Sequence, residues 1–164
     1  MTGLLLTLLY TTAMAAQEDD AEYIRGTIDG EVMEWIVHRT PSHTSAVFST
    51  LLPGVHSVSI SGYTDDRFSR EGSVSISFTL NDERVQEPEV LYFPFNPLHP
   101  RFSFGSDHGT GELVIESIEI DTSGARVKGR YQGELYYHQS PNTRPISRRT
   151  AEADIEFNLL SVRQ

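Results

Sequence analysis

The sequence predicts an all-β protein, an antiparallel β-sandwich or flattened barrel of about nine strands. Hydrophobic and polar residues alternate with a period of two along most of the chain, which is typical of strands that bury one face. Short turn sequences separate the alternating runs, and no long run has the spacing of an amphipathic helix. Together these patterns favour strands joined by tight turns over any mixed or helical fold.

Hairpin signals define the first half of the chain. Asp29-Gly30 separates residues 23–28 from residues 31–37, and Asp-Gly is among the strongest signals for a two-residue hairpin. Pro53-Gly54 separates the next two runs in the same way. The clearest strand covers residues 73–80, in which four hydrophobic residues alternate with serine and threonine. We expect those hydrophobic side chains to face the core.

The second half repeats this organisation. Residues 112–120 and 125–137 flank a turn at residues 121–124, and residues 151–159 alternate again near the end of the chain. Two of these runs carry opposite charges on their outward faces. The basic stripe is Arg126, Lys128 and Arg130, and the acidic stripe is Glu152, Asp154 and Glu156. If the two strands are neighbours, the stripes neutralise each other, with about 0.2–1 kcal/mol per pair.

An aromatic segment breaks the alternation. Residues 87–104 contain repeated prolines, which are excluded from central strands, so only residues 90–93 can pair there, at an edge. The remainder is predicted to be a long loop on the body of the domain. Exposed aromatic side chains on loops are typical of binding surfaces. The candidate binding residues are therefore Tyr92, Phe93, Phe95, Phe102 and Phe104. The alternative is that these rings plug the open end of a sandwich.

A second candidate site follows from the register of the hairpin at residues 121–124. A four-residue loop pairs Ile118 with Val127 and places Glu116 inward, opposite Gly129 and beside Tyr131. An inward carboxylate and phenol could line a small-ligand or hydrolase pocket, with His56 nearby. The alternative is a bulge at Glu116 that turns this carboxylate out to solvent. A third possibility is a structural subunit that adds strands to a partner through unpaired edges at residues 23–28 or 90–93.

Other chemistry has little support in the sequence. The six histidines are scattered, and the segment from Asp107 to Glu112 lacks the ligand spacing of a zinc or calcium site, so we expect no metal and no cofactor. Neither a nucleophile elbow nor a phosphate-binding glycine loop is present. The net charge of -10 disfavours nucleic acid as a partner and favours solubility.

Residues 1–16 have the pattern of an export signal. An apolar run precedes Ala13, Ala15 and Ala16, and an acidic segment follows, so cleavage is expected after Ala15 or Ala16. Residues 17–164 would then form one β-sandwich domain, periplasmic or secreted. The chain has no Cys, and therefore neither a disulfide nor a thioether-linked lipid. We accordingly expect no stable membrane anchor after cleavage of the signal.

Two motifs carry a resemblance to a known group of proteins. Gly26-Thr-Ile-Asp-Gly-Glu-Val-Met-Glu-Trp35 opens the domain, and Val127-Lys-Gly-Arg-Tyr-Gln-Gly-Glu-Leu135 comes late in it. The pair resembles exported bacterial β-sandwich proteins of uncharacterised function. The resemblance implies a β-sandwich and no catalytic residues. The leading hypothesis is therefore an exported, non-catalytic binding or accessory domain that recognises a protein partner or a glycan through residues 92–104.

Overall fold

The computed structural model describes residues 21–40, 43–82 and 84–163, and the predicted signal at residues 1–16 lies outside this range. All the regular secondary structure described is β-strand, which confirms the all-β prediction. The strands are β1 (Tyr23–Ile28), β2 (Glu31–Trp35), β3 (Arg39–Thr40), β4 (His43–Thr44), β5 (Ala46–Leu52), β6 (Val55–Gly62), β7 (Ser73–Asn81), β8 (Arg84–Phe93), β9 (Arg101–Phe104), β10 (Thr110–Ile120), β11 (Gly124–His138) and β12 (Ile146–Arg163).

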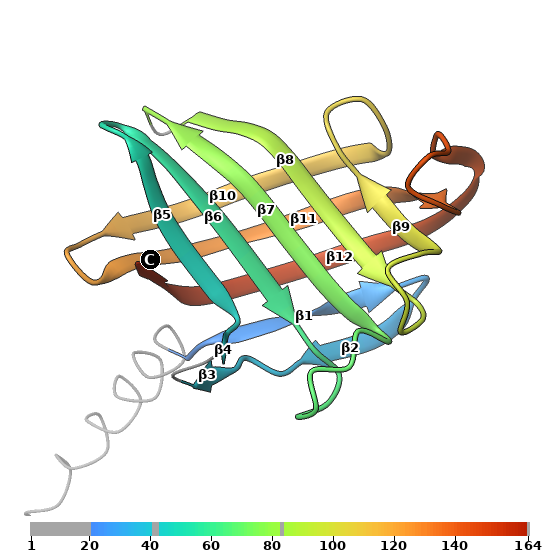
Figure 1. Cartoon of the computed structure of the whole chain (residues 1–164), viewed down its shortest axis with the longest axis horizontal. Coiled ribbons are helices and arrows are strands. Elements are labelled where there is room, and N and C mark those ends of the chain that lie inside the picture. The colour runs from blue at the N-terminus through green and yellow to red at the C-terminus, as the bar shows by residue number, and fades with distance from the viewer. Residues whose placement is uncertain (1–20, 41–42, 83, 164) are drawn as a thin grey trace, which may run out of the picture.

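Ten strands form one mostly antiparallel sheet in the order β10-β11-β9-β8-β7-β6-β5-β12-β1-β2. Because β11 also pairs with β12, the sheet closes on itself into a partial ring. The closure is narrow: β5 joins β12 in parallel through two residue pairs, and β9 joins β11 through three. Figure 1 shows β5 to β8 crossing over β10, β11 and β12, so the ring is flattened into two layers.

The core lies between these layers and is built by the predicted alternation. In β7 the inward residues are Val74, Ile76, Phe78 and Leu80, all buried, and they face the buried side chains of β12 and β11. The largest fully buried side chains are Tyr131, Phe48 and Phe157. The hairpin at Asp29-Gly30 is also confirmed, since both residues have positive φ (51° and 79°), as a two-residue turn of this kind requires.

The aromatic segment differs from the prediction of a long loop. β8 runs through Pro88 to Phe93, and β9 contains Phe102 and Phe104, so the loop is confined to residues 94–100. Pro88 is accommodated because the β7–β8 register shifts between Ser77 and Thr79, and Glu87 has a positive φ of 49°. Such a bulge is one of the few places in a sheet that accept proline.

Both edges expected for strand addition are paired. β1 lies between β2 and β12, and residues 90–92 of β8 lie between β7 and β9. The prediction of unpaired edges at residues 23–28 and 90–93 is therefore wrong. Within the described residues, the sheet ends at β2 and β10 instead.

β11 and β12 are neighbours, but their register pairs only one residue of the basic stripe with one of the acidic stripe, because Lys128 faces Asn158 and Asp154 faces Gln132. Arg130 lies opposite Glu156, whose other neighbour is Arg25 on β1, with 3.4 Å between the Arg25 Nη2 and Glu156 Oε2 atoms. Both Arg25 and Glu156 side chains are about half exposed. Water and salt screen such a pair, so we assign it little stabilisation.

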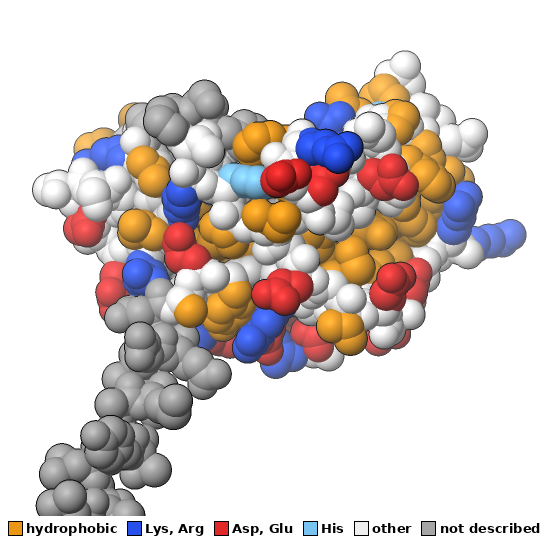
Figure 2. All heavy atoms as spheres, turned by 90° about the horizontal axis from the view of Figure 1, so that it is seen from below, with side chains coloured by type: hydrophobic (Ala, Val, Ile, Leu, Met, Phe, Trp, Pro, Cys, Tyr) orange, Lys and Arg blue, Asp and Glu red, His pale blue; other side chains and the backbone are white. Residues whose placement is uncertain are grey.

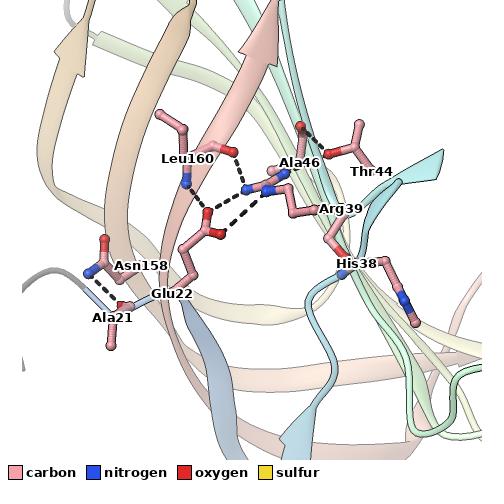
Figure 3. A network of polar contacts seen from close by, with 9 residues as sticks. Ala21, Glu22, His38, Arg39, Thr44, Ala46, Asn158 and Leu160 are labelled. Atoms are coloured by element: carbon pink, nitrogen blue, oxygen red, sulfur yellow. Dashed lines mark hydrogen bonds and ion pairs between the residues drawn. The ribbon is translucent and has the colours of Figure 1, made fainter. Parts of the chain in front are cut away.

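A polar network fastens the start of the described chain to β12 (Figure 3). The Arg39 guanidinium donates to the Glu22 carboxylate, to the Leu160 carbonyl and to the Thr44 hydroxyl. The Leu160 N–H in turn donates to Glu22 at 2.6 Å, and the Asn158 amide donates to the Ala21 carbonyl at 3.1 Å. Burial alone would raise the pKa of Glu22, but these hydrogen bonds and the Arg39 charge hold it below its ordinary value.

Glu22→Gln is expected to lower the free energy of unfolding by about 1 kcal/mol at pH 7, because it removes a charge-assisted hydrogen-bond pair. A lowered folded-state pKa gives stability that is present above the unfolded-state pKa and lost as the pH falls through the folded-state value. The difference from wild type should therefore shrink between pH 5 and pH 3 in urea unfolding. Glu156→Gln, in the exposed pair, should change stability by less than about 0.5 kcal/mol; equal losses in both variants would contradict this interpretation.

Candidate functional site

The structure separates the five predicted aromatic residues into three groups. Phe93 and Phe104 are buried, with 6% and 8% of their surface exposed. Tyr92 and Phe102 are half-buried and pack against the core from its end. Phe95, with 49% exposed, lies in the loop that follows β8. The five rings therefore do not form a single exposed surface, because β8 and β9 pair and turn alternate side chains inward.

Tyr92 and Phe102 belong to an aromatic cluster at this end of the ring. Their ring centroids lie 6.3 Å apart, and the Phe102 ring lies 5.5 Å from that of Tyr137. The Arg149 guanidinium covers Tyr137 at 3.8 Å from the ring centroid. Tyr137 is buried at the end of β11, and the alternating sequence of this strand gives no sign of the cluster. Figure 2 shows hydrophobic side chains gathered towards the end where β8 and β9 meet, with acidic and basic side chains around them.

A shallow cavity of about 430 Å³, wide open to solvent, lies beside Tyr92. Tyr92 and Pro94 line it from the end of β8. The loop between β6 and β7 contributes a polar wall, through Thr64, Asp65, Ser69, Glu71 and Gly72. Tyr92 was predictable from the sequence, whereas these loop residues were not, because their composition indicates only a turn.

The loop between β6 and β7 has a defined shape. One Asp65 carboxylate oxygen accepts hydrogen bonds from the backbone N–H groups of Arg67 and Ser69, at 3.0 and 3.1 Å. The Thr64 hydroxyl donates to the Glu71 carbonyl at 2.8 Å, which closes the loop across its base. The Trp35 indole N–H donates to the Gly72 carbonyl at 2.8 Å and ties the loop to β2. The polar wall is therefore built before a ligand arrives.

An aromatic cluster supports the same loop from its other side. The rings of His38 and Phe68 lie 4.2 Å apart, and both lie 5.6 Å from Tyr63. His38 also lies within hydrogen-bonding distance of the Asp65 carbonyl, at 3.3 Å. These contacts hold the segment that carries Asp65 against β6 and the chain after β2.

The site is acidic. Burial raises the pKa of the Tyr92 phenol, and the negative charges of Glu31 and Asp29 raise it further. The phenol therefore stays protonated and can donate a hydrogen bond. Asp65 and Glu71 also line the cavity, so its lining combines an aromatic residue with acidic residues.

The alternative pocket around Glu116 and Tyr131 does not form as expected. The pairing of Ile118 with Val127 is confirmed, but the register shifts between Ile115 and Ser117, so the inward position of Glu116 is wrong. Glu116 is exposed, and its carboxylate lies 3.8 Å from the Lys128 ammonium. The bulge moves every residue before it to the other face of the sheet.

Tyr131 is inward, as predicted, and fully buried. Its hydroxyl donates to the Thr110 carbonyl at 3.2 Å, and burial, with a smaller contribution from Glu134, raises the pKa of the phenol. Gly129 leaves no free space beside Tyr131, since a Cβ on Gly129 would lie 2.6 Å from the Val114 carbonyl oxygen and 2.8 Å from Phe157. Tyr131 therefore packs against backbone and side chains rather than lining a pocket.

A hydrogen-bond chain with the order Ser–His–Asp occurs where β9 gives way to β10. Ser103 Oγ lies 2.9 Å from His108 Nε2, and Asp107 lies 2.6 Å from His108 Nδ1. However, Ser103 is only 1% exposed, and a nucleophile must be reachable by its substrate. β9 and β10 pair in succession with the same edge of β11, and residues 105–109 between them form a loop that does not pair with β11. The Ser103–His108–Asp107 hydrogen bonds hold the loop at residues 105–109 against β9, so their role is structural.

Within the described residues, no group of three or more His, Cys, Asp or Glu could hold a metal ion, and no helix is long and apolar enough to cross a membrane. Comparison with family models, curated proteins and solved structures gives no match to this chain. The cavity beside Tyr92 therefore has to be interpreted from its own geometry.

Proposed function

We propose that this protein is an exported, non-catalytic binding domain that recognises a glycan in the cavity beside Tyr92. The observation that carries the proposal is the pairing of one aromatic wall, Tyr92 with Pro94, and one polar wall with the side chains of Asp65, Ser69 and Glu71. Export follows from the predicted signal at residues 1–16.

The chemistry of the two walls suits a sugar ring. A pyranose has an apolar C–H face that packs on an aromatic ring, and equatorial hydroxyls that donate to carboxylates. The Asp65 oxygen bonded to backbone N–H groups is fixed in place, so little ordering is required on binding. An acidic cavity also disfavours anionic ligands, which leaves neutral or amino sugars as the expected class.

A protein partner is the less suitable occupant. The volume of about 430 Å³ lies within the range of small-ligand sites, about 300–1,000 Å³. Phe95 and Leu98, both exposed, lie in the loop directly after Pro94 and could extend contact to further sugar units.

Glu71→Gln is expected to weaken oligosaccharide binding about tenfold or more, because a charge-assisted acceptor is lost. A glycan array would identify the ligand, and titration calorimetry would then compare the variants. Asp66→Asn is the matched control, since Asp66 is exposed in the same loop and does not line the cavity.

Phe102 is unsuited to this test, because it packs on Tyr92 and Tyr137 and its removal would disturb the fold. The proposal would be wrong if Glu71→Gln bound oligosaccharides as tightly as Asp66→Asn. It would also be wrong if a correctly folded protein bound no neutral or amino sugar on the array.

A further inference from the structure

The partial ring has an opening at the end of the sheet where β6 begins and β7 ends. The Tyr92 cavity lies at the other end of these two strands. β8 pairs with β9 only at Val90, Leu91 and Tyr92. Its earlier residues, from Arg84 to Glu89, pair only with β7 among the described residues, and β10 pairs only with β11. The two layers therefore separate between the first half of β8 and β10.

A cavity of about 460 Å³ lies at this opening. It is lined by Gly54 and His56 of the β5–β6 hairpin, Leu80 and Asp82 at the end of β7, and Ile118 and Ile120 of β10. Walls from both layers thus meet around one space, of a size common for small-ligand sites. It shares no lining residue with the cavity beside Tyr92.

The greater part of this wall is hydrophobic. Leu80, on one layer, is buried, whereas Ile120, which lines the same cavity from the other layer, is 45% exposed. Leu51 and Leu52, on the hairpin that carries Gly54, are also largely exposed. Clustered exposed aliphatic side chains beside a cavity are typical of surfaces that are covered by an apolar ligand.

The polar part of the wall has a fixed geometry. The Asp82 N–H donates to the Gly54 carbonyl at 3.2 Å, and Asp82 has a positive φ of 46°. The exposed Asp82 carboxylate lies beside Gly54, since a Cβ on Gly54 would lie 3.0 Å from the Asp82 Oδ1 atom. The His56 ring stacks on Phe48 with centroids 4.9 Å apart, and His56 Nδ1 lies 3.2 Å from the Thr50 hydroxyl. No cation forms an ion pair with Asp82 in the part of the chain that the structure describes.

We infer that this cavity is a second binding site, for an organic ammonium ion with an apolar body. The ammonium group pairs with the Asp82 carboxylate, and the apolar body packs against Leu80, Ile118 and Ile120. A neutral apolar ligand would bury part of the carboxylate without a partner, which is unfavourable. An organic anion would be repelled by Asp82 and by the net charge of -10.

The test compares two probes of the same shape and opposite charge, 2-phenylethylammonium and 3-phenylpropionate, by titration followed with ¹H–¹⁵N NMR at pH 7.5. The ammonium probe is expected to bind at least tenfold more tightly and to shift signals of the residues that line this cavity. Asp82→Asn should weaken its binding about tenfold, because the charge-assisted hydrogen bond is lost. Asparagine tolerates a positive φ as aspartate does, so the turn should be kept.

Glu119→Gln is the control for charge alone, because Glu119 is an exposed neighbour of Ile118 and Ile120 that does not line the cavity. It should leave binding within twofold of wild type, and Ile120→Asn should weaken it with an unchanged circular dichroism spectrum. Equal binding of both probes, or equal losses in Asp82→Asn and Glu119→Gln, would overturn the inference. Neither result bears on oligosaccharide binding at Tyr92.

Discussion

Trp35→Ala is expected to lower the free energy of unfolding by about 3–5 kcal/mol, the range for removal of a buried tryptophan. The side chain is 2% exposed, and β2 carries it onto the core opposite Ile24 of β1. Its packing is close, since a Cβ on Gly62 would lie 2.6 Å from the Trp35 Cβ and 3.0 Å from its Cγ.

The same substitution also removes a hydrogen bond that positions the candidate site. The indole N–H donates to the Gly72 carbonyl, so its loss leaves the β6–β7 loop without its tie to β2. Trp35→Phe keeps most of the ring but not the donor, and we expect it to cost less stability than alanine while still weakening oligosaccharide binding.

Urea unfolding should be followed by circular dichroism, because Trp35 is the only tryptophan and its fluorescence is lost in both variants. A loss below about 1.5 kcal/mol for Trp35→Ala would show that this end of the core is loosely packed. Binding by Trp35→Phe equal to wild type would show that the tie to Gly72 does not position the polar wall.

The strands and most of their buried side chains could be predicted from the sequence, because inward-facing residues in a regular strand recur at every second position. β7 and β12 follow this rule without interruption through Val74 to Leu80 and Ala151 to Leu159. The Asp29-Gly30 turn was predictable for a separate reason, since few residue pairs accept two positive φ angles.

The failures occur at bulges. One extra residue between Ile115 and Ser117 moves Glu116 from the inner to the outer face, and a second bulge lets β8 continue through Pro88. Neither has a strong local signal, although three consecutive hydrophobic residues before Glu116 are consistent with a change of face. A bulge is set by how two strands pair, which a single sequence does not reveal.

The candidate site was only partly predictable for a related reason. Tyr92 was identified from composition, but the other lining residues lie mostly in a polar turn 20 to 28 positions earlier. They come to line the same cavity because β7 and β8 form a hairpin whose open end brings Gly72 to Phe93, where the Gly72 N–H donates to the Phe93 carbonyl at 2.7 Å. The cavity at Asp82 likewise requires β10 to face β7, a contact between distant segments.

Gly133→Ala is expected to lower the free energy of unfolding by about 3 kcal/mol, the upper part of the range for overpacked sites. Gly133 pairs with Gly111 across β10 and β11. A Cβ on Gly133 would lie 2.0 Å from the Thr110 carbonyl oxygen and 2.5 Å from the Gly111 Cα atom. Both are backbone atoms, so the contact can be relieved only by moving β10 away from β11.

That movement would also disturb a buried hydrogen bond. The Tyr131 hydroxyl donates to the same Thr110 carbonyl, and a buried phenol that loses its acceptor costs about 1–3 kcal/mol. The substitution therefore acts on strand pairing and on the core together, although it adds a single methyl group. Gln132→Ala is the matched control, because Gln132 is the exposed neighbour on the same strand and should change stability by less than about 0.5 kcal/mol.

Trp35 fluorescence gives the measurement, since this side chain is buried in the folded state and exposed on unfolding. The urea midpoint of Gly133→Ala should fall well below those of wild type and Gln132→Ala, with a similar slope. Equal midpoints for the two variants would mean that β10 can shift along β11 without loss. Glycine at this position would then serve the curvature of the sheet rather than the close approach of its strands.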